Sequence, residues 1–339
     1  MTENQQSETP SWKTELKKSF TDIHTLLDFL ELDPSRSPWP FLEKSEFPML
    51  VTRSFAKRMK KKDWNDPLLL QVLPLAEEHK PVPGYETDAV GDLQSTVARG
   101  LIRKYRNRAL LICHPTCAVH CRYCFRRQYP YQGLPRNPEQ WTPAWNYLHQ
   151  HPDIEEIILS GGEPLMLDNQ ALEQVLHQLS GIPHIKTVRI HTRMPVALPS
   201  RIESGLLSVL NKATNEHQEI ITIIQANHPA ELKDECLGAI KELLLTGMLV
   251  FNQSVLLKDI NDSMEIQSVL SRRLISTGIV PYYLHQLDKT RGTHHFEVSE
   301  RSAGELWEEM KQKLPGYALP RFVREVPGMK YKVAFDSRN

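Results

Sequence analysis

The sequence has no excess of charge of either sign, since its 339 residues include 41 basic and 41 acidic side chains. Such a balance gives no overall attraction to nucleic acid or to an anionic membrane surface. Long apolar runs are also missing: Ala109–Cys113 is typical of the longest, whereas a membrane-spanning helix needs about 20 apolar residues. The polar N-terminus, Met1 to Trp12, lacks the pattern of a secretory signal. We therefore expect a cytoplasmic protein without nucleic-acid or membrane partners.

Cysteine is scarce as well: five cysteines in 339 residues do not make a disulfide scaffold, and their number is odd. Three of the five lie close together, at Cys117, Cys121 and Cys124. In a reducing compartment such crowding indicates metal binding or catalysis rather than crosslinking. The other two, Cys113 and Cys236, lie in a predicted strand and a predicted helix, and we interpret them as core residues.

What is present is an ordinary globular composition, with 40% hydrophobic and 24% charged residues. The pattern predicts three regions: a helical N-terminal region and linker (1–95), a central core (96–298) and a C-terminal helix with a short terminal segment (299–339). In the first region, residues 12–32, 54–62 and 66–73 have helical character. Residues 77–92 are rich in proline, glycine and acidic side chains, so we interpret them as a linker or an extended surface segment.

From about residue 105, short apolar runs alternate with amphipathic helical stretches. Strands are predicted at 109–113, 156–159, 187–191, 220–225, 249–256 and 280–285. Helices are predicted at 138–150, 170–179, 200–211, 229–246, 263–277 and 299–314. Six β-α units in series require a parallel sheet, either an open doubly wound sheet or a partial barrel. In both architectures the chemistry lies at the carboxyl ends of the strands.

The strongest motif is the C-x3-C-x2-C triplet Cys117–Cys121–Cys124, directly after the first predicted strand. Thiolates hold iron–sulfur clusters, and this spacing lets one loop wrap a cluster. Three cysteines on a [4Fe–4S] cluster would leave one iron open. Zinc is the alternative, and it needs a fourth ligand that His114 or His120 could supply.

A second motif, Gly161-Gly162-Glu163-Pro164, follows the second predicted strand. Its glycines permit close backbone approach and positive φ. Alone it would be an ordinary turn, but behind the cysteine triplet it resembles the SAM-binding loop of radical S-adenosylmethionine (SAM) enzymes. That resemblance implies an α/β fold with a partial (β/α)6 barrel and SAM bound at the open iron. It also implies SAM contacts from Tyr123 and from Ser160, Gly161, Gly162 and Glu163.

Further segments narrow the resemblance to the lysine 2,3-aminomutases, over roughly residues 95 to 335. These segments are Tyr105–Leu111, Cys124–Arg127, Asn252–Leu257, Pro281–His285 and Gly316–Val323. Residues 53–55 and 66–73 most resemble the bacterial branch called elongation factor P β-lysylation protein. The resemblance implies an isomerase that makes (R)-β-lysine from L-lysine for modification of elongation factor P. It also implies a [4Fe–4S] cluster, SAM, pyridoxal phosphate (PLP), an electron donor and a lysyl ligase that uses the product; a homo-oligomer is left open.

The same resemblance assigns roles to individual residues. Lys332 corresponds to the lysine that forms the Schiff base with PLP, with Lys330 as a rival two residues before it. The other correspondences are Tyr105 and Arg108 at the PLP phosphate, Gln253 at a cofactor, Arg126 at the substrate carboxylate, and Asp288 and Glu325 at the distal ammonium of lysine. We expect no structural zinc, because Ser263 stands where some relatives have a cysteine and the chain ends at Asn339 without a cysteine cluster.

Two alternatives remain from the sequence. One is a radical SAM aminomutase that acts on another amino acid such as glutamate, although Asp288 and Glu325 would repel a distal carboxylate. The other is a metal-stabilised nucleic-acid-binding module that uses Arg122, Arg126 and Arg127, which the neutral net charge disfavours.

Overall fold

The computed structural model describes residues 11–215 and 219–335. Its centre is a sheet of ten strands that lie side by side in the order of the sequence. The strands are β1 (Thr96–Ala98), β2 (Leu101–Tyr105), β3 (Arg108–His114), β4 (Glu156–Gly161), β5 (Thr187–Thr192), β6 (Glu219–Gln225), β7 (Leu249–Val255), β8 (Val280–His285), β9 (Arg321–Arg324) and β10 (Val333–Ala334). Pairing is parallel from β3 to β9 and antiparallel between β1, β2 and β3 and between β9 and β10.

Sequential strand order distinguishes this sheet from a doubly wound sheet, in which the order reverses at a switch point. The α/β fold class and all six predicted strands are confirmed. The prediction missed a seventh parallel strand, β9, which pairs with β8 through the register Tyr283↔Arg321. With four residues, two of them arginine, β9 has too little apolar character to be recognised as a strand.

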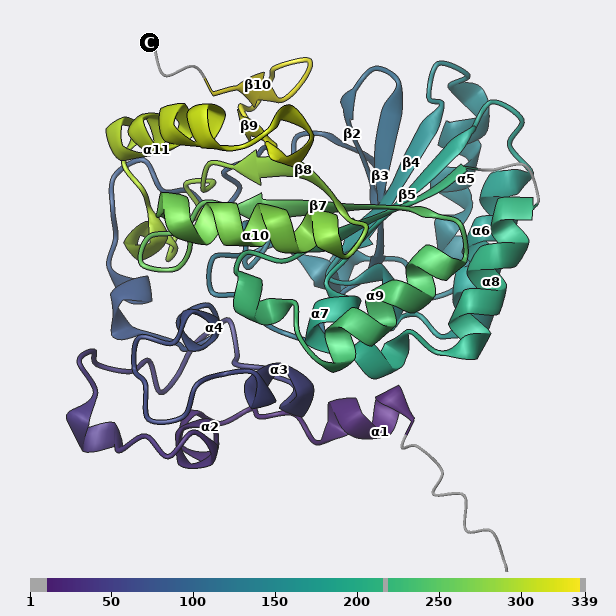
Figure 1. The fold of residues 1–339 in the computed structure, drawn as a ribbon. Coiled ribbons are helices and arrows are strands. Elements are labelled where there is room, and N and C mark those ends of the chain that lie inside the picture. Colours follow the sequence, from purple (N-terminus) through teal and green to yellow (C-terminus); the bar gives the residue numbers. More distant parts are fainter. Residues whose placement is uncertain (1–10, 216–218, 336–339) are drawn as a thin grey trace, which may run out of the picture.

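Helices cover the outside of the sheet, as Figure 1 shows for α6, α8, α9 and α10. The helices of this layer are α5 (Pro138–Gln150), α6 (Asn169–Ser180), α7 (Met194–Ala197), α8 (Ser204–Asn215), α9 (Glu235–Leu245), α10 (Met264–Ser276) and α11 (Glu300–Lys313). Several begin where the sequence supplies a capping side chain: Asn137, Asp168, Ser263 and Ser299 each accept a hydrogen bond from a backbone N–H of the first turn. Such caps fix helix starts locally, which explains why these bounds could be predicted closely.

Along each strand, successive side chains point alternately to the helix-covered face of the sheet and to the opposite face. In β4, Ile157 and Leu159 are fully buried in the core beneath the helices, while Ile158 and Ser160 line a central cavity. In β5, Val188 and Ile190 are likewise buried in the core beneath the helices, whereas Arg189 faces the cavity. Period-two alternation therefore places a polar-lined cavity on the inner face of the sheet.

The N-terminal region is more broken than its helical spacing predicts. Its helices are α1 (Trp12–Lys17), α2 (Ile23–Phe29), α3 (Arg53–Lys57) and α4 (Pro67–Leu70). Phe20 separates α1 from α2 because its backbone pairs with Val51. The side chains of Leu26, Phe55 and Leu69 belong to the same apolar core as the strands, so this region packs directly onto the barrel.

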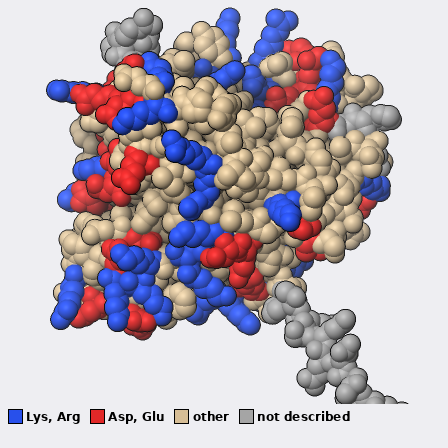
Figure 2. Space-filling view, in the orientation of Figure 1, with Lys and Arg blue, Asp and Glu red and all other residues tan. Residues whose placement is uncertain are grey.

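Charged side chains of both signs are interspersed on the face shown in Figure 2. Among the described residues, no helix is long and apolar enough to cross a membrane. Residues 77–92 are not extended as interpreted from the sequence: they include most of a 3-10 helix (Ala76–His79) and several turns, and Glu86 pairs with Thr290 in an isolated bridge. Two acidic side chains of this segment, Glu78 and Asp92, are nevertheless buried.

Candidate active site

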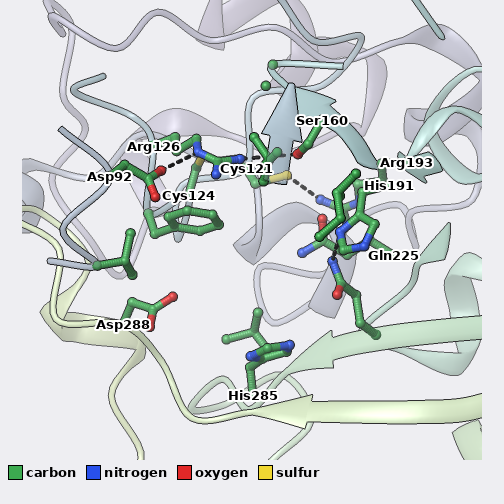
Figure 3. A pocket seen from close by; sticks show the side chains of 18 of the residues that line it. Asp92, Cys121, Cys124, Arg126, Ser160, His191, Arg193, Gln225, His285 and Asp288 are labelled. Atoms are coloured by element: carbon green, nitrogen blue, oxygen red, sulfur yellow. Dashed lines mark hydrogen bonds and ion pairs between the residues drawn. The ribbon is translucent and has the colours of Figure 1, made fainter. Parts of the chain in front are cut away.

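A cavity of about 490 Å³ opens on the inner face of the sheet, at the carboxyl ends of the strands. Strands β3 to β9, the loop after β3 and the C-terminal segment all contribute lining residues. Figure 3 shows part of this lining, with acidic, basic and cysteine side chains facing one space. This is where α/β architectures place their chemistry, and the cavity brings together the residues singled out from the sequence.

The cysteine triplet lies in the loop between β3 and α5, and Cys117, Cys121 and Cys124 all line the cavity as free thiols. Burial raises the pKa of the Cys124 thiol to about 11. Among the residues described, no group of three or more His, Cys, Asp or Glu side chains is placed to hold a metal ion. Cys121 Sγ instead accepts a hydrogen bond from Arg193 Nη1 at 2.6 Å.

The two histidines considered as a fourth ligand for zinc are held by the backbone. His120 Nδ1 lies 2.8 Å from the carbonyl oxygen of Pro48, and His114 Nδ1 accepts from the Thr116 amide at 3.2 Å. Both contacts involve Nδ1, and a hydrogen bond at one ring nitrogen is compatible with metal ligation through the other.

The Gly-Gly-Glu-Pro loop packs against the cysteine loop at backbone distance. Gly161 has φ +121°, and a Cβ on Gly162 would lie 2.6 Å from the carbonyl oxygen of Thr116. Glu163 points inward and accepts from the backbone N–H groups of Arg193 and Leu165 at 2.8 and 3.0 Å. Burial raises the pKa of Glu163 to about 7. The side chain of Glu163 therefore braces the loop in this structure, and the glycines make the close approach possible.

Tyr123 and Arg193 belong to a buried polar network beneath the cysteine loop. Arg193 Nη2 donates to Gln71 and Glu231 at 2.7 and 2.8 Å. Tyr123 receives a 2.6 Å hydrogen bond from Asn227 and donates to Gln71. Arg193 was not among the predicted site residues; its place just past the end of a parallel strand was the available signal.

Arg126 lies in the wall of the cavity and is 7% exposed. Its Nε donates to Asp92 at 2.6 Å and its Nη1 to Ser160 at 3.2 Å. The side chains of Arg122 and Arg127 are also little exposed, at 0% and 6%, and both pair with Glu78. The three arginines thus form internal ion pairs instead of the exposed basic surface that a nucleic-acid-binding module would need.

The C-terminal segment brings Glu325 and Lys332 to the cavity. Lys332 Nζ lies 2.5 Å from Glu325 Oε2, and the Tyr105 hydroxyl donates to Glu325 Oε1 at 2.7 Å. Burial alone would raise the pKa of Glu325, but Lys332, Tyr105 and Lys104 outweigh it and hold the pKa below its usual value. Lys330 is exposed and is not among the residues that line the cavity.

Asp288 follows β8 and faces the same cavity (Figure 3). Burial raises the pKa of its carboxyl to about 7, and the nearby Glu325 adds to this effect. The two carboxyl groups therefore differ in charge at neutral pH. The partners of Glu325 keep it ionised, whereas Asp288 has a pKa close to 7 and is partly protonated.

Several arginine and histidine side chains on the inner face of the sheet have buried nitrogen atoms that make no hydrogen bond. Among the described residues, buried atoms without a hydrogen-bond partner include Arg108 Nε, Arg189 Nε and His191 Nε2. Burial lowers the pKa of His191 and of His285 well below the usual range, so both rings are neutral at pH 7. Gln253 Nε2 lies 3.4 Å from His191 Nδ1. Buried polar atoms without partners are costly, so this wall suits an anionic ligand with several acceptor oxygens.

Comparison with known proteins identifies first the superfamily and then the enzyme family to which the chain is similar. Residues 111–266, which include the cysteine and glycine loops, match the model of the Radical SAM superfamily. The L-lysine 2,3-aminomutases of Escherichia coli (strain K12) and of Buchnera aphidicola subsp. Baizongia pistaciae are each 40% identical to this chain. Their alignments cover 97% and 95% of this chain and 96% and 94% of the relatives. The enzyme of Haemophilus influenzae is 35% identical over 97% of this chain and 96% of that relative.

The chain therefore belongs to the lysine 2,3-aminomutase family of radical SAM enzymes, which are isomerases. This family implies a [4Fe–4S] cluster, SAM and PLP. The residues present fit that set in their chemistry: three thiols on one loop, unsatisfied guanidinium nitrogens suited to a phosphate, and a half-buried lysine beside a carboxylate.

Proposed function

We propose that this protein converts L-lysine to (R)-β-lysine by a PLP-dependent 2,3-amino migration. The observation that carries the proposal is the charge layout of one cavity. Arg126 supplies a guanidinium suited to an α-carboxylate, and Asp288 and Glu325 supply carboxylates suited to a distal ammonium. A substrate with a distal carboxylate, such as glutamate, would meet repulsion from both acids.

The roles of the protein groups follow from their positions. Cys117, Cys121 and Cys124 would hold the cluster, Lys332 would bind PLP, and Arg108 would pair with its phosphate through the unsatisfied Nε. When bound, these cofactors supply a radical that removes a substrate hydrogen atom and a conjugated π system across which nitrogen can move. Glu325 holds Lys332 in the cavity, and the loop glycines keep the two cofactor loops in contact.

The decisive experiment is an anaerobic assay of the reconstituted holoenzyme with SAM, PLP and a strong reductant. L-lysine is expected to yield (R)-β-lysine, identified by chiral chromatography, and L-glutamate is expected to give no product above background. Preferential turnover of glutamate, or an (S)-configured product, would contradict the proposal.

We further propose that the product serves the modification of elongation factor P. This proposal is supported by the resemblance of residues 53–55 and 66–73 to the branch that feeds this modification, and these residues build α3 and the capped start of α4. In an extract lacking the endogenous aminomutase, the active enzyme is expected to restore β-lysyl-modified elongation factor P, detected by mass spectrometry. Failure to restore it while β-lysine accumulates would separate the enzyme from this pathway.

A further inference from the structure

Charges of alternating sign run along one wall of the cavity. Arg126 Nε contacts Asp92 Oδ2 at 2.6 Å, and Lys104 Nζ contacts Asp92 Oδ1, also at 2.6 Å. Lys104 Nζ then lies 4.0 Å from Glu325 Oε1, and Glu325 contacts Lys332. This series links the group proposed to bind the substrate carboxylate to the groups proposed to bind the ammonium and PLP.

Asp92 is the member of this series that sequence reasoning passed over. It lies in the 77–92 segment interpreted as a linker, yet its side chain is 1% exposed. Burial alone would raise the pKa of Asp92, but Arg126 and Lys104 outweigh it and keep the carboxyl ionised. Its own backbone N–H donates to Asp88 Oδ1 at 2.8 Å, so the segment holds the carboxylate in place.

The contacts of Asp92 fix the plane of the Arg126 guanidinium. A guanidinium is flat and recognises a carboxylate best through two parallel N–H bonds, so its orientation decides whether that contact forms. Asp92 holds Nε, and Ser160 of β4 holds Nη1 at 3.2 Å. Together they set the plane of the guanidinium while leaving further N–H groups for a ligand.

We propose that Asp92 is the positioning residue of Arg126 and that Lys104 balances its charge, so the 77–92 segment sets selectivity for substrates that carry an α-carboxylate. This inference rests on the proposed role of Arg126 in the lysine site. Although Asp92 lines the cavity, the role proposed for it is to hold Arg126 in the orientation that a carboxylate requires.

The test compares two ligands that differ in the carboxylate alone: L-lysine and 1,5-diaminopentane, which is lysine without that group. Binding to the PLP-loaded holoenzyme is followed by the change in the visible PLP spectrum. Asp92→Asn preserves the shape of the side chain and removes its charge. It is expected to weaken L-lysine binding about 10- to 100-fold, as befits loss of a well-placed charge-assisted bond, and to leave diaminopentane affinity unchanged within about threefold.

Two further variants keep the test sharp. Asp92→Glu retains the charge but moves it by one methylene, so it is expected to lose less lysine affinity than Asp92→Asn and again to spare diaminopentane. Glu86→Gln removes an exposed acid from the same segment and is expected to change neither affinity. Equal weakening of both ligands in the Asp92 variants, which a merely structural role predicts, would overturn the proposal.

The outcomes also separate this inference from the proposed function. If wild-type enzyme prefers lysine over diaminopentane but Asp92→Asn keeps that preference, Asp92 is not the positioning residue and the lysine site stands. If wild-type enzyme binds the two ligands equally, Arg126 does not recognise a carboxylate, and both proposals fail.

Discussion

Burial raises the pKa of two acidic residues of the site, Asp288 and Glu163, to about 7, and Asp288 is the one proposed to face the substrate ammonium. Burial raises the pKa of Asp288 to about 7, with Glu325 adding to the shift, while the partners of Glu325 keep its own pKa below the usual value. A carboxyl with a raised pKa is neutral below that pKa and ionised above it. Attraction for a substrate ammonium through Asp288 is therefore gained as pH rises through about 7.

This predicts a rising acidic limb in kcat/KM for L-lysine. Below pH 7 the value is expected to fall about tenfold per pH unit, because kcat/KM reports groups of the free enzyme. Asp288→Asn is expected to remove this limb and to lower kcat/KM at pH 8 about 10- to 100-fold. Steady-state kinetics between pH 5.5 and 8.5 (about three units) measures both effects, with PLP and iron contents as controls. An unchanged slope in the variant would exclude Asp288 as its source.

Two neighbouring lysines differ in their surroundings. Lys330 and Lys332 have the same parity, which would place them on one face of an extended strand. The backbone from Val326 to Tyr331 forms turns and bends instead, with Gly328 at φ +80°, so parity does not apply there. Lys332 lines the cavity and Lys330 is exposed.

Lys332→Ala is therefore expected to abolish the visible absorption band of bound PLP and most aminomutase activity. Lys330→Ala is the matched control and is expected to retain both, because its side chain lies outside the cavity. Absorption spectra and borohydride reduction followed by peptide mapping provide the measurement. A reduced pyridoxyl label on Lys330 would refute the assignment.

At the scale of elements, the cysteine loop after β3 and the glycine loop after β4 depend on each other. Parallel pairing of β3 with β4 places their carboxyl ends together, with His114 opposite Gly161. The loops then touch through backbone atoms at Gly162 and Thr116. Only a residue without a side chain fits this contact.

Gly162→Ala is expected to push the two loops apart and to cost about 1–3 kcal/mol, the usual penalty of overpacking. We expect lower iron retention after anaerobic reconstitution and SAM binding weakened about 5- to 150-fold, since about 1.4 kcal/mol is a factor of ten. Gly133→Ala is the control, because a Cβ there has no neighbour within 4 Å. Equal iron content and SAM affinity in the two variants would contradict this account.

At the scale of the whole molecule, the N-terminal region is tied to the barrel by buried charge. Glu78 and Arg122 have no exposed side-chain surface, and Arg122 Nε donates to Glu78 Oε1 at 2.8 Å. Arg127 pairs with the same carboxylate. Since both arginines flank Cys124, the 77–92 segment supports the cysteine loop from one side while Asp92 supports Arg126.

Removing one partner of such a buried ion pair leaves the other charge buried without a counter-charge, which typically destabilises the fold by about 3–5 kcal/mol. Glu78→Ala is therefore expected to lower the free energy of unfolding by about that amount in urea titrations followed by circular dichroism. Glu305→Ala breaks the exposed pair with Arg301 and is expected to change stability by less than about 1 kcal/mol. A loss below about 1 kcal/mol in Glu78→Ala would show that Arg122 finds other partners.

The sequence by itself determined the features that depend on near neighbours along the chain. Strand alternation, helix caps such as Asn137 and Ser263, and the cysteine and glycine loops are all written in residues a few positions apart. The parallel sheet then follows, because β-α units allow no other pairing. The family resemblance came from these same local motifs.

Only the tertiary structure decided the features that join distant residues. The contact of Phe20 with Val51 interrupts what periodicity predicts as one helical stretch, and β9 becomes a strand because β8 offers it an edge. The side chain of Asp92 is buried because it forms ion pairs with Arg126 and Lys104. No pattern within residues 77–92 predicts these pairs. The physical reason is the same for Phe20, for β9 and for Asp92. Strand pairing and burial depend on the residues that a segment contacts, and in each case those residues lie far away in the sequence.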